Sequence, residues 1–252
     1  MTTTTAPGQG DLTEGSSAAP GVLQAFFDDP TFGTLPALLV CMTVVTGLVD
    51  AVSILRLGRV FVANMTGNVV FLGFAAARAP GFSLVASLVA LAGFMVGAIA
   101  GGRLARRGGA AAHLLAGAAV VETVLTAAAL IVVAVAGLPA PLATTSAVAG
   151  LLALAMGVQI AVARQLAVPD LTTTVLTMAL TGFAADPRSR PRARRAASVI
   201  AMFGGAVLGA TLVLQGRSWV ALGVATALLL AVAVLAARSA HTRTADASSD
   251  IS

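Results

Sequence analysis

Eight long apolar runs, separated by short polar stretches, occupy most of this 252-residue sequence. A helix needs about 20 mostly apolar residues to cross the hydrocarbon core of a bilayer. Only 10% of the residues are charged, so a water-soluble fold could not cover its own apolar surface. We therefore expect an all-α polytopic transmembrane bundle without a sizeable soluble domain. The runs cover Leu35–Leu55, Val60–Ala77, Phe82–Leu104, Ala112–Ala136, Leu142–Ala163, Leu171–Ala185, Ala197–Leu214 and Trp219–Ala237.

Arginine is the only basic residue besides two histidines, and its fifteen copies gather between the apolar runs. This pattern is typical of cytoplasmic loops under the positive-inside rule, and it argues against nucleic-acid binding. If the clusters at 103–107, 188–195 and 238–243 share the cytoplasmic side, an even number of crossings separates the first two clusters. Three apolar runs lie between those two clusters, so one of the three does not cross.

The run Leu171–Ala185 is the shortest and most polar of those three, and we predict that it is re-entrant or broken. By analogy, we predict the same of Val60–Ala77. The result is about six crossings with both termini inside. Arg56 and Arg59 then lie outside, against the rule, and an alternative with seven crossings lets Val60–Ala77 span the membrane. We expect the polar residues 1–33 and 238–252 to form disordered tails.

Short matches at a nearly constant offset predict an internal repeat, with halves at about 34–136 and 142–237. Since Gly and Ala are abundant, coincidence of composition is the alternative. Three crossings plus one broken segment would place the second half upside down, and inverted repeats with interrupted segments at matching positions are typical of secondary transporters. The matched stretches are Gly47–Ala51 with Gly157–Ala161, the region of Thr66 with that of Thr177, and Gly97–Gly101 with Gly205–Gly209.

The run Asn64-Met65-Thr66-Gly67-Asn68 places two amides and a hydroxyl inside an apolar segment. Amides donate and accept hydrogen bonds, and glycine relaxes the local backbone, so this run is a candidate break that binds a substrate. The alternative is that these side chains cross-link neighbouring helices. The threonines of the matched run are weaker candidates, because a threonine hydroxyl can bond to its own helix. The candidate substrate-binding residues are Asn64, Thr66, Gly67, Asn68, Thr174 and Thr177.

Two carboxyl groups lie inside apolar runs. Asp50 precedes the end of the first run by about 9 Å of helix rise, and Glu122 lies about 15 Å into the fourth. Charge at such depth is costly, so both are candidates for proton or ion coupling. The alternative for Asp50 is an ion pair with Arg56 or Arg59. The alternative for Glu122 is a neutral acid hydrogen-bonded to a neighbouring helix.

One cysteine and two histidines form no metal-binding pattern, and no P-loop or GxSxG motif is present. We expect no metal, no cofactor and no enzymatic activity. The expected partners are the lipid bilayer and an unknown small solute, with self-association into a homo-oligomer left open and no nucleic acid. The leading hypothesis is a small secondary transporter or permease. The alternative is a membrane sensor or scaffold that transports nothing.

The stretch from Gly47 to Gly73, GLVDAVSILRLGRVFVANMTGNVVFLG, resembles the hallmark of the YoaK-like family of bacterial multi-pass membrane proteins. The second-half stretch GVQIAVARQL, followed by TTTVLT, is similar to that family's second signature, with Ile160 where the family usually has asparagine. The resemblance covers about Leu35 to Ala237. It implies a multi-pass protein of the bacterial inner membrane, in a family catalogued as a domain of unknown function.

Overall fold

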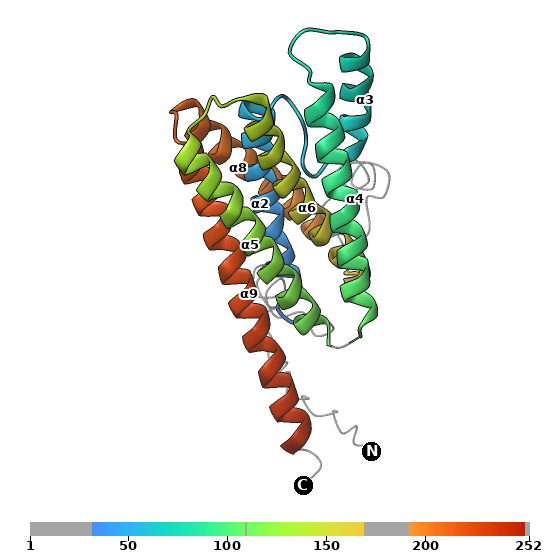
Figure 1. Cartoon of the computed structure of the whole chain (residues 1–252). Coiled ribbons are helices and arrows are strands. Elements are labelled where there is room, and N and C mark those ends of the chain that lie inside the picture. The colour runs from blue at the N-terminus through green and yellow to red at the C-terminus, as the bar shows by residue number, and fades with distance from the viewer. Residues whose placement is uncertain (1–31, 109, 169–191, 250–252) are drawn as a thin grey trace, which may run out of the picture.

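The computed structural model describes residues 32–108, 110–168 and 192–249, and these ranges form a bundle of helices joined by short connections (Figure 1). Six of the helices are long and apolar enough to cross a membrane, and the seventh, α3, is short. The predicted all-α polytopic bundle is thereby confirmed, with six helices of crossing length among the described residues; the run Leu171–Ala185, predicted to be re-entrant or broken, lies outside them. The helices are α2 (Leu35–Arg56), α3 (Met65–Ala76), α4 (Leu84–Arg106), α5 (Ala111–Ala136), α6 (Leu142–Leu166), α8 (Arg192–Leu214) and α9 (Ser218–Ser249).

Local sequence signals set several of the helix ends. Pro36 lies in the first turn of α2, where a missing N–H is tolerated. The Ser83 side chain caps α4 by accepting a hydrogen bond from the Ala86 N–H. Gly137, with a φ of 70°, ends α5. Helix α9 extends to Ser249, eleven residues beyond residue 238, where the expected tail begins.

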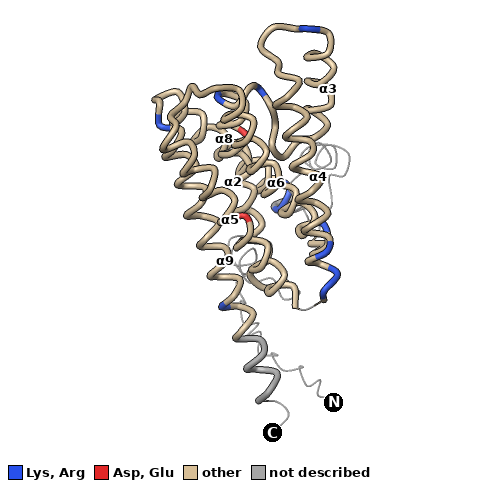
Figure 2. The backbone as a smooth tube through the Cα atoms, viewed as in Figure 1, with Lys and Arg blue, Asp and Glu red and all other residues tan. Residues whose placement is uncertain are grey.

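The helices run in two opposite directions. Helices α2, α5 and α8 run from the end of the bundle that holds the C-terminus, and α4, α6 and α9 run back toward it (Figure 1). Arginines gather at both ends and are more numerous at the end where α4 and α9 finish, which we call the arginine-rich end (Figure 2). Described arginines at this end are Arg103, Arg106, Arg107, Arg164, Arg194, Arg195 and Arg238, and those at the opposite end are Arg56, Arg59, Arg78 and Arg217.

Two helices lie at the centre of the bundle. In their most apolar stretches, 72% of the residues of α2 and 67% of those of α6 are buried, against 28–39% in the other four long helices. Large apolar side chains on the outer helices are exposed, including Val135 on α5 and Phe203 on α8. Such an outward apolar surface fits lipid rather than water.

The two central helices each cross one outer helix at very close range. Helix α2 packs against α8, and α6 packs against α4. A Cβ added to Gly47 of α2 would lie 2.8 Å from the Ala206 nitrogen, and one added to Gly157 of α6 would lie 2.8 Å from the Ala98 nitrogen. Any side chain at either glycine would therefore collide with the backbone of the neighbouring helix.

Candidate functional site

The apolar run Val60–Ala77 does not form one continuous helix. Helix α2 ends at Arg56, residues 57–64 are not helical, and α3 begins at Met65. Gly58, with a φ of 93°, lies at the turn after α2. The chain then runs back alongside the bundle, and α3 returns toward the end where α2 finishes (Figure 1). The segment therefore begins and ends at the same end of the bundle. The predicted broken character of this run is borne out.

Asp50 of α2 holds the non-helical stretch in place. Its Oδ1 accepts hydrogen bonds from the backbone N–H groups of Val62 (3.0 Å) and Ala63 (3.4 Å). Both residues are buried, so without this acceptor their N–H groups would be unpaired in an apolar interior. The alternative ion pair is not observed, because Arg56 Nη2 donates instead to the Val213 carbonyl, at 3.2 Å.

Asn68 of α3 ties the same stretch to the short helix. Its Oδ1 accepts from the Phe61 N–H at 2.8 Å, and its Nδ2 donates to the Phe61 carbonyl at 2.6 Å. The side chain is 1% exposed and both ends of its amide are occupied. Asn68 therefore pairs with Phe61 much as one strand pairs with another, and its structural role is to position the break.

The other predicted substrate-binding residues of this run lie at the start of α3. Asn64 is the N-cap of α3, and its Oδ1 accepts from the Gly67 N–H at 3.4 Å. Gly67 lies under the Phe61 ring, where an added Cβ would come within 2.6 Å of a ring carbon. Thr66 is exposed. Thr174 and Thr177 lie outside the described residues, and a substrate-binding role for any of these residues remains a prediction.

A cluster of aromatic rings fastens the break to α3 and to the start of α4. The Phe61 and Phe71 rings stack with centroids 5.4 Å apart, and Phe82 lies 5.1 Å from Phe71 and 5.3 Å from Phe74. The Arg59 guanidinium lies over Phe82, 5.8 Å from the ring centroid. Packing at one end of the bundle thus supplements the hydrogen bonds from Asp50 and Asn68.

A polar contact that the sequence did not single out joins the two central helices. Gln159 Nε2 of α6 donates to Thr46 Oγ1 of α2 at 2.9 Å, and Thr46 in turn donates to the Met42 carbonyl at 3.0 Å. Both side chains are 1% exposed. The available signal was weak: Gln159 belongs to the second-half signature and lies one residue from the position matched to Asp50.

Glu122 of α5 is fully buried and has no hydrogen-bond partner on either carboxyl oxygen. Thr126, one turn later on the same face, is also fully buried with an unpaired hydroxyl. Helix α5 packs here against α6 and α9. The hydrogen bond to a neighbouring helix that was the alternative for Glu122 is not observed among the described residues.

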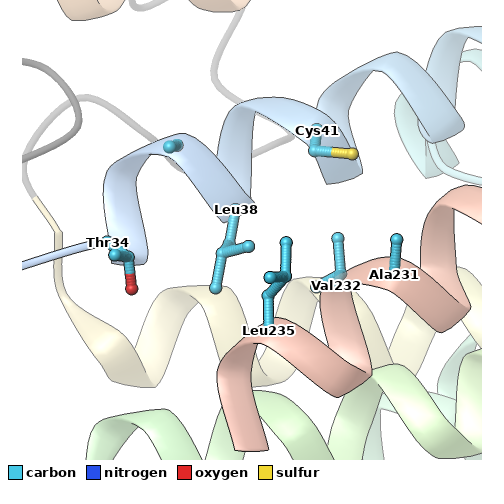
Figure 3. Close-up of a pocket in the computed structure, with 7 residues that line it drawn as sticks. Thr34, Leu38, Cys41, Ala231, Val232 and Leu235 are labelled. Atoms are coloured by element: carbon cyan, nitrogen blue, oxygen red, sulfur yellow. The ribbon is translucent and has the colours of Figure 1, made fainter. Parts of the chain in front are cut away.

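An apolar cavity of about 290 Å³ lies between α2 and α9 (Figure 3). It is at the arginine-rich end, whereas the break begins at the opposite end of α2. The single cysteine, Cys41, lines it. The other lining residues are Thr34, Ala37, Leu38, Ala231, Val232 and Leu235.

Comparison with known proteins agrees with this architecture. Residues 38–235 match a family described as "Protein of unknown function (DUF1275)". The chain belongs to this family. It is also 34% identical over 152 residues to the "UPF0700 transmembrane protein YoaK" of Bacillus subtilis (strain 168). That match covers 60% of this chain and 66% of the relative, just under two thirds of its length. No solved structure matches the chain. The resemblance inferred from the Gly47–Gly73 stretch is thereby confirmed, as is a multi-pass membrane protein.

Proposed function

We propose that this protein is a small secondary transporter or permease for a small solute, located in the bacterial inner membrane. The arginine-rich end faces the cytoplasm in this proposal, as the positive-inside rule favours. The observation that carries the proposal is the break at residues 57–64, in which Leu57, Val60, Val62 and Ala63 are buried. Non-helical backbone at membrane depth is tolerated where it is buried in protein or lines a cavity, and transporters place their binding sites at such breaks.

The arrangement of the helices supports an inverted repeat. If α2, α4 and α5 correspond to α6, α8 and α9, each helix of the first half runs opposite to its counterpart. The exchange turns the α2–α8 crossing into the α6–α4 crossing, and it turns the α5–α6 contact into the α9–α2 contact. Such a repeat places related segments of the two halves around one central site.

The glycines at the two crossings support the same correspondence at the level of single residues. Gly47 approaches Met202 and Ala206, while Gly157, 110 positions later, approaches Phe94 and Ala98, which precede those partners by 108 positions. Thus both sides of the first crossing have counterparts in the second. A coincidence of composition could match the glycines, but it would not also match the residues that they approach on the neighbouring helices.

Within this proposal, the solute site lies between the break and the two central helices. The predicted residues divide by role. Asp50 and Asn68 shape the break through its backbone, while Asp50 and Glu122 are the groups proposed to couple transport to protons or ions. The solute contacts proposed for Asn64, Thr66 and Gly67 lie at the start of α3, and those proposed for Thr174 and Thr177 belong to the second half.

Solute-driven proton movement in proteoliposomes tests the proposal. Vesicles with a trapped pH-sensitive dye would receive a panel of amino acids, organic acids, amines and sugars. We expect at least one solute class to drive a pH change with the wild-type protein. Asp50→Asn and Glu122→Gln should abolish that change, and Asn68→Ala should reduce it.

Val135→Ala serves as the matched control, because Val135 is 84% exposed on the outer face of α5 and should leave the signal unchanged. No response from folded protein to any solute would overturn the transporter and favour the sensor or scaffold. A response that survives all three site substitutions would overturn the assignment of the site.

A further inference from the structure

Two buried oxygen atoms near the centre of the bundle lack hydrogen-bond donors. Asp50 Oδ1 accepts from the break, but Asp50 Oδ2 has no partner. Gln159 Nε2 donates to Thr46, but Gln159 Oε1 has no partner. Buried acceptors are usually paired in folded proteins, so these two oxygens have the capacity to accept from, or coordinate, a bound group.

These oxygens belong to one polar island between α2 and α6. Thr46 and Asp50 are one turn apart on the same face of α2, which places their Cβ atoms about 6 Å apart. The Gln159 amide nitrogen lies 2.9 Å from Thr46 Oγ1, and its oxygen is joined to that nitrogen through a single carbon. Nearby positions along α2 and α6, among them Val49, Val52 and Met156, carry buried apolar side chains.

The charge of the island is a single unit, that of the Asp50 carboxylate. None of the described arginines at the end opposite the arginine-rich end is shown paired with Asp50. Arg56 binds the Val213 carbonyl, Arg59 lies over Phe82, and Arg78 and Arg217 are exposed. On the helices packed against α2, the other described charged or titratable groups lie toward the arginine-rich end. These are Arg164 on α6, Arg194 and Arg195 on α8, and Arg238 and His241 on α9. A buried carboxylate that pairs with no cationic side chain is unstable unless a bound cation or a proton neutralises its charge.

We propose that Thr46, Asp50 and Gln159 bind one monovalent cation, either a sodium ion or a proton carried by Asp50. The ligand set consists of oxygen atoms only, which suits a hard cation, and one negative charge matches one positive charge. This inference rests on the proposed transport function and names its coupling ion by class. Since Asp50 also holds Val62 and Ala63, the cation site is directly attached to the backbone of the break.

Binding is tested on the purified full-length protein without any solute, so that its outcome is separate from that of the flux experiment. Thermal unfolding can be followed by the circular dichroism of the helices, a signal that depends on neither sodium nor thiol ionisation. A ligand that binds only the folded protein raises its Tm. One arm replaces choline chloride by sodium chloride at constant ionic strength, and a second arm varies pH in choline chloride.

For a sodium site, we expect sodium to raise the wild-type Tm and Asp50→Asn to abolish that rise. Thr46→Val should raise the half-maximal sodium concentration by about tenfold or more, since it removes a bond to a charged ligand. Thr46→Ser should retain the response. For a proton site, sodium has no effect, the wild-type Tm rises as the pH falls, and Asp50→Asn and Gln159→Leu lose that rise.

Thr126→Val is the control, because it removes another fully buried hydroxyl, one that is unpaired and lies on α5 outside the island, and it should keep the response. The inference is overturned if the wild-type protein responds to neither ion, if Asp50→Asn responds like the wild type, or if Thr126→Val removes the response. Solute flux without any cation response would contradict the cation site and support the transporter. A cation response without solute flux would support the cation site and contradict the transporter.

Discussion

The crossing of α2 with α8 and the crossing of α6 with α4 are nearly the same in backbone and different in chemistry. At both, a glycine of the central helix meets the backbone of the outer helix at matching distances. Only α2, however, carries a buried carboxyl group and holds a break, through Asp50. The corresponding position of α6, 110 residues later, is Ile160, and its neighbour Gln159 reaches across to Thr46 instead.

The packed helix backbones at the two crossings, which we call the frame, have different requirements from the polar site. Close approach of two backbones requires glycine on both sides, so the frame limits substitution equally in the two halves. The polar groups are under no such constraint, and both buried carboxyl groups described by the structure, Asp50 and Glu122, come from the first half. A symmetric frame therefore encloses an asymmetric site.

The largest effect should come from breaking the frame. Gly47→Ala and Gly157→Ala would each place a Cβ against the backbone of the neighbouring helix, and we expect a loss of about 3 kcal/mol of stability from such overpacking. Thermal unfolding in detergent measures the loss. Gly204→Ala is the control, because an added Cβ there meets nothing within 4 Å. Clearly unequal losses at Gly47 and Gly157 would contradict the equivalence of the crossings.

A smaller effect should expose the chemical difference between the halves. Asp50→Ala leaves the Val62 and Ala63 N–H groups without an acceptor, and we expect a loss of about 2 kcal/mol. Asp50→Asn retains an accepting oxygen and should lose less than Asp50→Ala. Ile160→Ala, at the matched position, should change packing alone and leave the break protected. Amide hydrogen exchange at residues 57–64 reports this directly, and equal exchange in Asp50→Ala and Ile160→Ala would rule out the tethering role.

The smallest effect on stability, and of opposite sign, should come from Glu122. Its carboxyl group is buried and unpaired, so Glu122→Leu removes a polar group that gains nothing in the fold. We expect stability to stay the same or to rise by about 1 kcal/mol, while solute-driven proton movement is lost. A strongly destabilised Glu122→Leu would indicate that this carboxyl group has a structural partner, as Asp50 has.

The sequence alone predicted the helical frame well. The bounds of the long helices lie close to those of the apolar runs, except that α8 begins earlier and α9 ends later than its run. The break between α2 and α3 followed from the polar residues of a short run. The glycine matches that suggested a repeat lie at the two crossings. Such features depend on apolar length and local composition, which a linear sequence carries directly.

The partners of the polar side chains could not be read in the same way. Asn68 looked free to bind a solute, but its amide is occupied by the Phe61 backbone. Thr46 was not singled out, because its bond to Gln159 joins residues 113 positions apart. Whether a polar side chain is free or occupied depends on which segments the fold brings together, and this becomes clear only in three dimensions.

The glycine contacts also have a mechanical consequence. Where two helix backbones touch directly, no flexible side chains lie between them to absorb a shift, so α2 with α8 and α4 with α6 should each move as one stiff body. The two central helices touch each other far less, through bonds such as that from Gln159 to Thr46. Relative movement of the two helix pairs should therefore meet least resistance at the contact between α2 and α6. This contact includes the polar island around Asp50.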